Sequence, residues 1–219
     1  MKRLTLLTLA ILLAACQSGI SQNTEHPVRT PKTADQLTDF EVAYFASGCF
    51  WCVEAIFQSV IGVEEAISGY SGGERPNPTY RQVSAGITRH AEAVAVYYDP
   101  DVVSFETLLE VFFGSHDPTT VDRQGPDRGP QYRSAVFYRN AEEERLTKAY
   151  IAQLESGAYS KGQIVTEVSA FKAFYEAEDY HQEYEYLHPD QPYVRSVSIP
   201  RLNRFKARYP HLLKEEESH

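Results

Sequence analysis

Apolar residues between positions 41 and 171 follow two alternating periodicities. Short apolar runs of strand length occupy 41–46, 63–70, 91–100, 134–139 and 164–171. After the first run, apolar side chains recur every three or four positions, as on one face of a helix: Val53, Ile56, Phe57 and Val60. Gly62 follows as a suitable stop signal. This pattern predicts a helix over 50–61 between the first two strands.

A second helical pattern follows the third strand. Ser104 is a suitable N-cap, Gly114 is a suitable end, and apolar residues repeat at helical spacing between them. Asn140 and Glu143 have the capping spacing for a further helix. The order over 41–139 is therefore βαββαβ, which predicts an α/β fold of the two-layer α+β type with a ferredoxin-like core and two helices on one face.

Two segments break this regularity. Residues 114–133 have no regular pattern, and a loop of that length inside a compact domain is usually functional. After residue 171 we expect a short helix followed by a long irregular C-terminal wrap. We place the globular domain at 41–200 and a charged tail at 201–219.

The N-terminus predicts export from the cytoplasm. Lys2 and Arg3 precede twelve mostly apolar residues, a run typical of a secretory signal and too short to span a bilayer. The sequence "LAAC" resembles the lipobox of bacterial lipoproteins, which implies cleavage after residue 15 and lipidation of Cys16. The alternative is an ordinary signal peptide with an incidental cysteine. Residues 16–40 would then form a polar tether to the membrane.

That resemblance implies a location in the bacterial cell envelope. The anchored domain would face the periplasm, and Gln17 resembles the sorting signal for the outer membrane. The formal net charge of −9 disfavours broad binding to nucleic acid or to an anionic membrane surface. We expect a monomer.

The stretch "GCFWC" carries the most reactive chemistry in the sequence. Cys49 stands where the first strand turns into the first helix, and Cys52 lies one turn further on the same face. Backbone N–H groups and the macrodipole at a helix N-terminus stabilise a thiolate, so we expect a lowered pKa for Cys49. No second CxxC supports a zinc site. The spacing alone leaves a redox or nucleophilic pair and two structural cysteines open.

Several motifs resemble one enzyme family in the same order. "GCFWCVEA" resembles the signature of A-type peptide methionine sulfoxide reductases, which act on the S-epimer of methionine sulfoxide. The resemblance continues through further matching segments: "GYSGG" (69–73), "NPTY" (77–80), "HAEAV" (90–94), "HDPTT" (116–120), "RQGPDRGPQYRS" (123–134) and "YHQEYEYL" (180–187). It implies an α/β roll with a ferredoxin-like core, which agrees with the predicted element order.

The resemblance also implies a set of site residues. Cys49 matches the nucleophile and Glu92 matches the acid. The substrate-binding residues it implies are Phe50 and Trp51 as an aromatic wall, Tyr80 and Tyr132 as paired phenols, and Asp127 as an organiser of the pocket. A sulfoxide needs an apolar wall for its methyl group and convergent donors for its oxygen. A shielded carboxyl with a raised pKa can supply the proton. No cofactor or metal is expected.

Recycling differs from the common pattern of the family. Many members resolve the cysteine sulfenic acid with cysteines in a C-terminal tail, but residues 53–219 contain none. We therefore predict a Cys49–Cys52 disulfide that a thioredoxin-type or other periplasmic thiol reductant reduces. The alternative is direct reduction of the sulfenic acid by an external thiol. Arg89 and Pro130 depart from common family residues at the rim of the pocket.

Two other functions fit the same sequence features. The same CxxC would suit a thiol–disulfide oxidoreductase, and the fold would suit a non-catalytic binding module of an envelope lipoprotein. His90 and His116 invite comparison with Cys-His nucleophile pairs, but we assign both to structural or supporting roles. The expected substrates are oxidised methionine residues in proteins, or free methionine sulfoxide.

Overall fold

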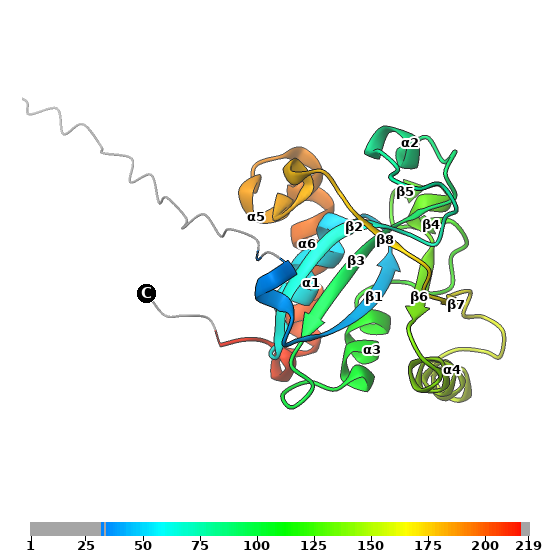
Figure 1. The fold of residues 1–219 in the computed structure, drawn as a ribbon. Helices are drawn as coiled ribbons and strands as arrows, with labels where there is room; N and C mark the ends of the chain where they lie inside the picture. Colours follow the sequence, from blue (N-terminus) through cyan, green and yellow to red (C-terminus); the bar gives the residue numbers. More distant parts are fainter. Residues whose placement is uncertain (1–31, 33, 216–219) are drawn as a thin grey trace, which may run out of the picture.

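A six-stranded sheet forms the centre of the fold in the computed structural model, which describes residue 32 and residues 34–215 (Figure 1). The expected signal peptide and Cys16 lie outside the described residues. Strands follow the order β7–β6–β1–β3–β2–β8 across the sheet. Their bounds are Glu41–Ser47 for β1, Val63–Ser71 for β2, Ala91–Tyr98 for β3, Ser134–Tyr138 for β6, Glu167–Ala170 for β7 and Phe174–Glu176 for β8.

The central four strands have the predicted split βαβ topology. β3 lies between β1 and β2 and is antiparallel to both, while β6 pairs antiparallel with the other edge of β1. Helix α1 connects β1 to β2, and helix α3 connects β3 to β6. The predicted ferredoxin-like core is therefore confirmed. β7 adds a parallel strand at one edge and β8 an antiparallel strand at the other.

Helices α1 (Phe50–Gln58) and α3 (Phe105–Gly114) bury their apolar faces on one side of the sheet. Phe45 of β1 lies between them, with ring centroids 5.1 Å from Phe57 and 5.2 Å from Phe112. Both predicted caps form: the side chains of Ser104 and Asn140 accept backbone N–H groups at the start of α3 and of α4 (Ala141–Ser156). This packing fixes the N-terminus of α1 at the edge of the core.

Two loops contain short elements that the apolar pattern did not predict. The segment expected to lack regular structure folds into a hairpin, β4 (Arg123–Gln124) with β5 (Asp127–Arg128), followed by the 3-10 helix η2 (Pro130–Tyr132). The Gly- and Pro-rich loop after β2 contains helix α2 (Tyr80–Ser84). Two-residue strands and five-residue helices are too short to show a periodicity.

The charged tail predicted from residue 201 is wrong for residues 201–212. A π-helical turn, η4 (Val194–Ser198), continues directly into α6 (Ile199–Arg208), which packs on α1, and a 3-10 helix, η5 (Pro210–Leu212), follows. Phe205 is only 2% exposed and Arg201 is also buried. Charged residues make up four of the ten residues of α6, including the buried Arg201, so composition did not distinguish this helix from a solvated tail.

The remaining elements of the C-terminal segment are shorter. After the 3-10 helix η3 (Asp179–His181), helix α5 (Tyr184–Leu187) lies against α1. On the face of the sheet opposite α1, the 3-10 helix η1 (Ala34–Leu37) contributes the buried Leu37. Within the described part of the chain, no helix has the length and hydropathy needed to cross a bilayer.

Candidate active site

Cys49 is the N-cap of α1, directly after the turn that leaves β1. The turn depends on Gly48, whose φ of +92° disfavours any side chain and whose added Cβ would lie 2.6 Å from Cβ of Gln124. Cys49 is 7% exposed, so its thiol lies just below the surface. The backbone N–H of Phe50 donates to Oε2 of Glu92 at 3.1 Å, which ties the first turn of α1 to β3.

The two thiols form a buried hydrogen-bonded pair. Burial raises the pKa of Cys49 well above its ordinary value, and the hydrogen bond to Cys52 and the charges of Cys52 and Glu92 raise it further. The expected fall in the Cys49 pKa is therefore wrong for this reduced form. A hydrogen bond from the Trp51 backbone acts in the expected direction, but the loss of solvent around a buried sulfur outweighs it.

Cys52 holds the stabilised thiolate of the pair. The hydrogen bond from Cys49 lowers the pKa of Cys52 to about 6, and Arg201 and the hydroxyls of Ser198 and Tyr193 act in the same direction against burial. Sγ of Cys52 lies 2.9 Å from Oγ of Ser198. The negative charge of the reduced pair thus rests on Cys52, while Cys49 keeps the proton.

Glu92 is a buried acid beside the thiol pair. Burial raises its pKa to about 8, and the negative charges of Asp127 and Cys52 add to this, against the N–H of Phe50. The carboxyl therefore carries a proton at neutral pH. This agrees with the expected shielded acid, which needs to hold a proton before it can donate one.

Aromatic side chains surround the first turn of α1. The Phe50 ring is buried against Tyr80 and His181, with centroids 6.3 and 5.1 Å away, and Trp51 is half-buried beside it. Nε1 of Trp51 donates to Nδ1 of His181 at 3.2 Å. Tyr184 stacks on the indole with a centroid distance of 3.7 Å and an interplanar angle of 9°. These contacts hold both rings in fixed orientations.

The two phenols expected to pair lie on separate loops that meet at the site. Tyr80 opens α2, where its N–H donates to Oε1 of Glu178 at 2.9 Å, and Tyr132 ends η2. Burial raises the pKa of Tyr80 to about 12 and that of Tyr132 further, and the charges of Glu92 and Cys49 act on both. Two protonated phenols thus converge on the acid and the thiol.

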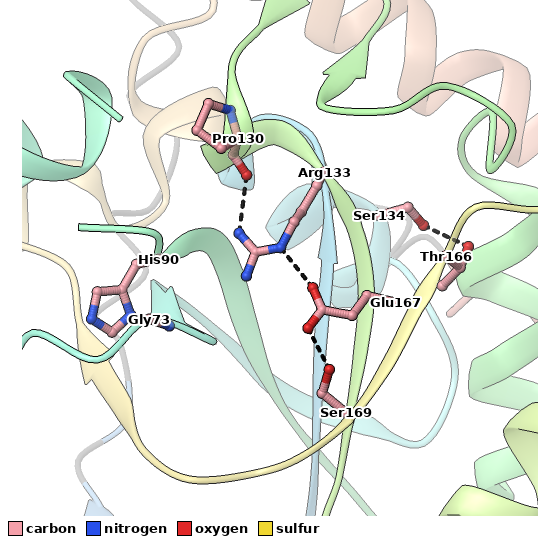
Figure 2. Close-up of polar contacts among 8 residues, drawn as sticks. All are labelled: Gly73, His90, Pro130, Arg133, Ser134, Thr166, Glu167 and Ser169. Carbon is pink, nitrogen blue, oxygen red and sulfur yellow. Dashed lines mark hydrogen bonds and ion pairs between the residues drawn. The ribbon is translucent and has the colours of Figure 1, made fainter. Parts of the chain in front are cut away.

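The Tyr132 loop is fixed to the edge of the sheet by its neighbour Arg133 (Figure 2). Nη1 of Arg133 donates to the carbonyl of Pro130 at 3.0 Å, and Nε donates to Oε2 of Glu167 at 2.9 Å. Ser134 and Thr166 add a hydroxyl contact of 2.8 Å beside this pair. These hydrogen bonds connect η2 to β7 and so hold the turn that carries the Tyr132 phenol.

Asp127 and Tyr193 form a further pair at the rim. The hydroxyl of Tyr193 donates to Oδ2 of Asp127 at 2.5 Å, and burial raises the pKa of Asp127 while Tyr193 lowers it. The motif reading assigned no role to Tyr193, Ser198 or His181. His181 lies in the quoted segment "YHQEYEYL", whereas Tyr193 and Ser198 precede or open α6 and had no local signal.

Both candidate histidines have structural partners. Nε2 of His116 contacts Oγ of Ser134 at 2.7 Å, and burial lowers its pKa to about 3, which keeps the ring neutral. His90 accepts the N–H of Gly73 at 3.1 Å and contacts the carbonyl of Arg75. Their hydrogen bonds support the structural roles assigned to them. In the described part of the chain no cluster of three or more His, Cys, Asp or Glu side chains is suited to a metal.

The chain is similar to known methionine sulfoxide reductases over most of its length. A family model described as peptide methionine sulfoxide reductase matches residues 41–212. The peptide methionine sulfoxide reductase MsrA of Polynucleobacter asymbioticus is 42% identical over 181 residues, which cover 83% of this chain and 95% of the relative. The MsrA of Thermus thermophilus is 46% identical over 80% of this chain and 98% of the relative.

Solved structures agree with the fold. Methionine sulfoxide reductase A of Corynebacterium diphtheriae superimposes with a TM-score of 0.64 at 33% identity, covering 73% of this chain and 83% of that chain. Mxr1 from Saccharomyces cerevisiae in its reduced form gives a TM-score of 0.64 at 30% identity, covering 74% and 90%.

The charge distribution within the thiol pair generates a direct spectroscopic prediction. In a Cys16→Ser background, absorbance near 240 nm should report one thiolate that forms with a midpoint close to pH 6, as the lowered pKa of Cys52 requires. Cys52→Ser should abolish this step, because the remaining Cys49 is buried and keeps its proton. A low-pH thiolate that survives in Cys52→Ser and disappears in Cys49→Ser would place the charge on Cys49 and contradict this assignment.

Proposed function

This chain belongs to the peptide methionine sulfoxide reductase family, and we propose that it reduces the S-epimer of methionine sulfoxide, free or in oxidised proteins, at Cys49. The observation that carries the proposal is the buried, protonated Glu92, whose carboxyl accepts the N–H of the residue next to Cys49. A proton donor and a sulfur nucleophile at one helix N-terminus suit a reaction that removes oxygen from sulfur.

The aromatic wall and the phenols supply the rest of the chemistry. Phe50 and Trp51 receive the substrate methyl group, because a rigid apolar surface recognises it without a polar partner. Tyr80 and Tyr132 donate hydrogen bonds to the sulfoxide oxygen, and Asp127 helps organise the pocket through Tyr193. This arrangement would distinguish the two epimers, since exchanging the methyl group and the oxygen would place each against the wrong surface. The assignment to the S-epimer rests on the resemblance to A-type reductases.

The reaction balances as a two-electron transfer between sulfurs. The Cys49 sulfur attacks the sulfoxide sulfur as its proton passes to the Cys52 thiolate, and Glu92 protonates the departing oxygen. The oxygen is transferred to the Cys49 sulfur, so the sulfoxide becomes methionine and Cys49 becomes a sulfenic acid. The Cys49 thiol is buried and protonated, so transfer of its proton to the adjacent thiolate activates it only when substrate is present.

Cys52 resolves the sulfenic acid. Its sulfur attacks Cys49, a disulfide forms, and the hydroxyl leaves as water. The hydrogen bond between the two thiols places the resolving sulfur beside the nucleophile from the outset. A thioredoxin-type periplasmic donor then reduces the disulfide by thiol exchange.

The N-terminal pattern supports a location in the bacterial cell envelope. We propose cleavage after residue 15 and lipidation of Cys16, which would anchor the domain to the envelope, facing the periplasm, and most simply to the outer membrane. Proteins of that compartment would be its substrates.

A stereochemical assay tests the proposed activity. With dithiothreitol as reductant, the enzyme should consume the S-epimer of a methionine sulfoxide peptide and leave the R-epimer. Cys49→Ser should lose at least about 10³-fold of the rate, since the nucleophile is removed. The proposal fails if neither epimer is consumed while disulfide exchange with a dithiol substrate proceeds, because the CxxC would then serve a thiol–disulfide oxidoreductase.

The resolving role of Cys52 has a separate test. Mixed with excess sulfoxide and no reductant, Cys52→Ser should form about one methionine per enzyme and then stop. It should do so more slowly than the wild type, because the thiolate that takes the Cys49 proton is also removed. It should cycle poorly with a dithiol protein, because no intramolecular disulfide can form. Wild-type enzyme treated in the same way should contain a Cys49–Cys52 disulfide by mass spectrometry. Normal cycling of Cys52→Ser with thioredoxin would exclude the role.

A further inference from the structure

Two adjoining hollows lie along α6, behind the thiol pair. The smaller, of about 190 Å³, is lined by Cys52 together with Gln124, Tyr193, Arg201 and Arg204. The larger, of about 510 Å³, shares Gln124, Arg201 and Arg204 and extends to Arg208. We call the two hollows together the arginine cleft. Cys52, which is 1% exposed, lines the smaller hollow, and Gln124 of the β4–β5 hairpin contributes to both hollows.

The cationic residues of the cleft form one stripe. Arg201, Arg204 and Arg208 are spaced three and four residues apart, so they share one face of α6 and extend over about 10 Å. Arg201 is buried, donating to the carbonyl of Ser115 at 2.8 Å and to Oγ of Ser47 at 3.2 Å. The other two arginines are exposed. This basic stripe stands out on a chain with a formal net charge of −9.

Two acids lie beside the stripe and offset part of its charge, but the described structure gives neither an ion pair with Arg204 or Arg208. Asp117 lines the larger hollow, where its carboxylate accepts from Thr119, and Asp127 lines the smaller, where it accepts from Tyr193. Among the described residues, the Arg204 guanidinium makes neither a hydrogen bond nor an ion pair, and Arg208 only lies over the ring of Tyr209, 5.3 Å from its centroid. Two planar guanidinium groups are thus available to bind carboxylates.

We propose that the arginine cleft is the docking surface for the reductant, a dithiol protein with acidic side chains around its cysteine pair. The proposal rests on the proposed function, because it concerns how the Cys49–Cys52 disulfide is reduced. A protein fits better than a small thiol. A small thiol in the smaller hollow would contact only one of the exposed arginines, Arg204. An acidic protein surface can contact Arg204 and Arg208 at once.

The cleft assigns Cys52 as the sulfur that the partner attacks. The partner's thiolate bonds to Cys52, the Cys49–Cys52 bond breaks, and Cys49 leaves with the electron pair and takes a proton. The thiolate of the partner's second cysteine then attacks the sulfur of the partner's first cysteine in the mixed disulfide, and Cys52 leaves. Two electrons pass from the partner's dithiol to the enzyme. The raised pKa of Cys49 makes it the poorer leaving group in the first exchange, so the position of Cys52 beside the cleft, rather than leaving-group strength, selects it for attack. The lowered pKa of Cys52 then favours its departure in the second exchange.

Charge reversal at the rim tests the docking surface. The full-length enzyme and its R204E/R208E variant are assayed for S-sulfoxide reduction with an acidic thioredoxin, thioredoxin reductase and NADPH. We expect the KM for thioredoxin to rise roughly tenfold in the variant, because two attractions become repulsions. Added salt should raise the KM of the wild type and change that of the variant little. Turnover with dithiothreitol, which is uncharged, should be the same for both.

The matched control is K161E/K172E, which changes the net charge equally at exposed lysines far along the chain from α6. It should keep the wild-type KM for thioredoxin. The proposal is overturned if the two double variants have the same KM. It is also overturned if R204E/R208E impairs turnover with glutathione but not with thioredoxin, which would assign the cleft to small anionic thiols. A wild-type enzyme inactive with dithiothreitol would overturn the proposed function itself, and this proposal with it.

Discussion

The hydrogen bond from the Phe50 N–H to buried Glu92 is the contact on which the site depends. It joins the first turn of α1 to the middle of the sheet, so the proposed nucleophile and the proposed acid are held by two different elements of one core. In the described structure this buried carboxyl accepts one backbone donor, which does not stabilise it enough to ionise at neutral pH. The same burial keeps Cys49 protonated. Both groups of the proposed reaction therefore store their protons until a substrate arrives.

The C-terminal segment completes the site from the opposite side. Trp51 is fixed by His181 and Tyr184, while Ser198 and Arg201 stabilise the charge of Cys52. The CxxC is thus flanked by two environments with different chemistry. Aromatic rings and phenols surround Cys49 on the side proposed for the sulfoxide, and hydroxyls and arginines surround Cys52 on the side proposed for the reductant. A single helical turn between the two cysteines would connect the proposed oxidation of Cys49 to the proposed reduction at Cys52.

Local patterns predicted the sheet, the two core helices and the position of Cys49, because strand runs, helical spacing and capping residues depend only on residues close together in the sequence. The motif resemblance also led to residues that the structure brings together, including Tyr80 and Tyr132 from separate loops. The pattern could not predict α6, because four of its ten residues are charged and one of its two buried residues is itself an arginine, Arg201. Nor could it predict the raised pKa of Cys49, since burial of that sulfur arises from segments far away in the chain. Both the formation of α6 and the pKa of Cys49 depend on packing against residues that are distant in the sequence.

The most direct measurement is the pH dependence of single-turnover sulfoxide reduction in the wild type and in Glu92→Gln. Glutamine can still accept the Phe50 N–H, but it has no proton to give. The account predicts that the wild-type rate falls as pH rises through about 8, as Glu92 loses its proton. Glu92→Gln should lower the rate by roughly 10²-fold or more and should lack that fall. A variant with the wild-type rate and the same decline would contradict the role of Glu92 as the proton donor.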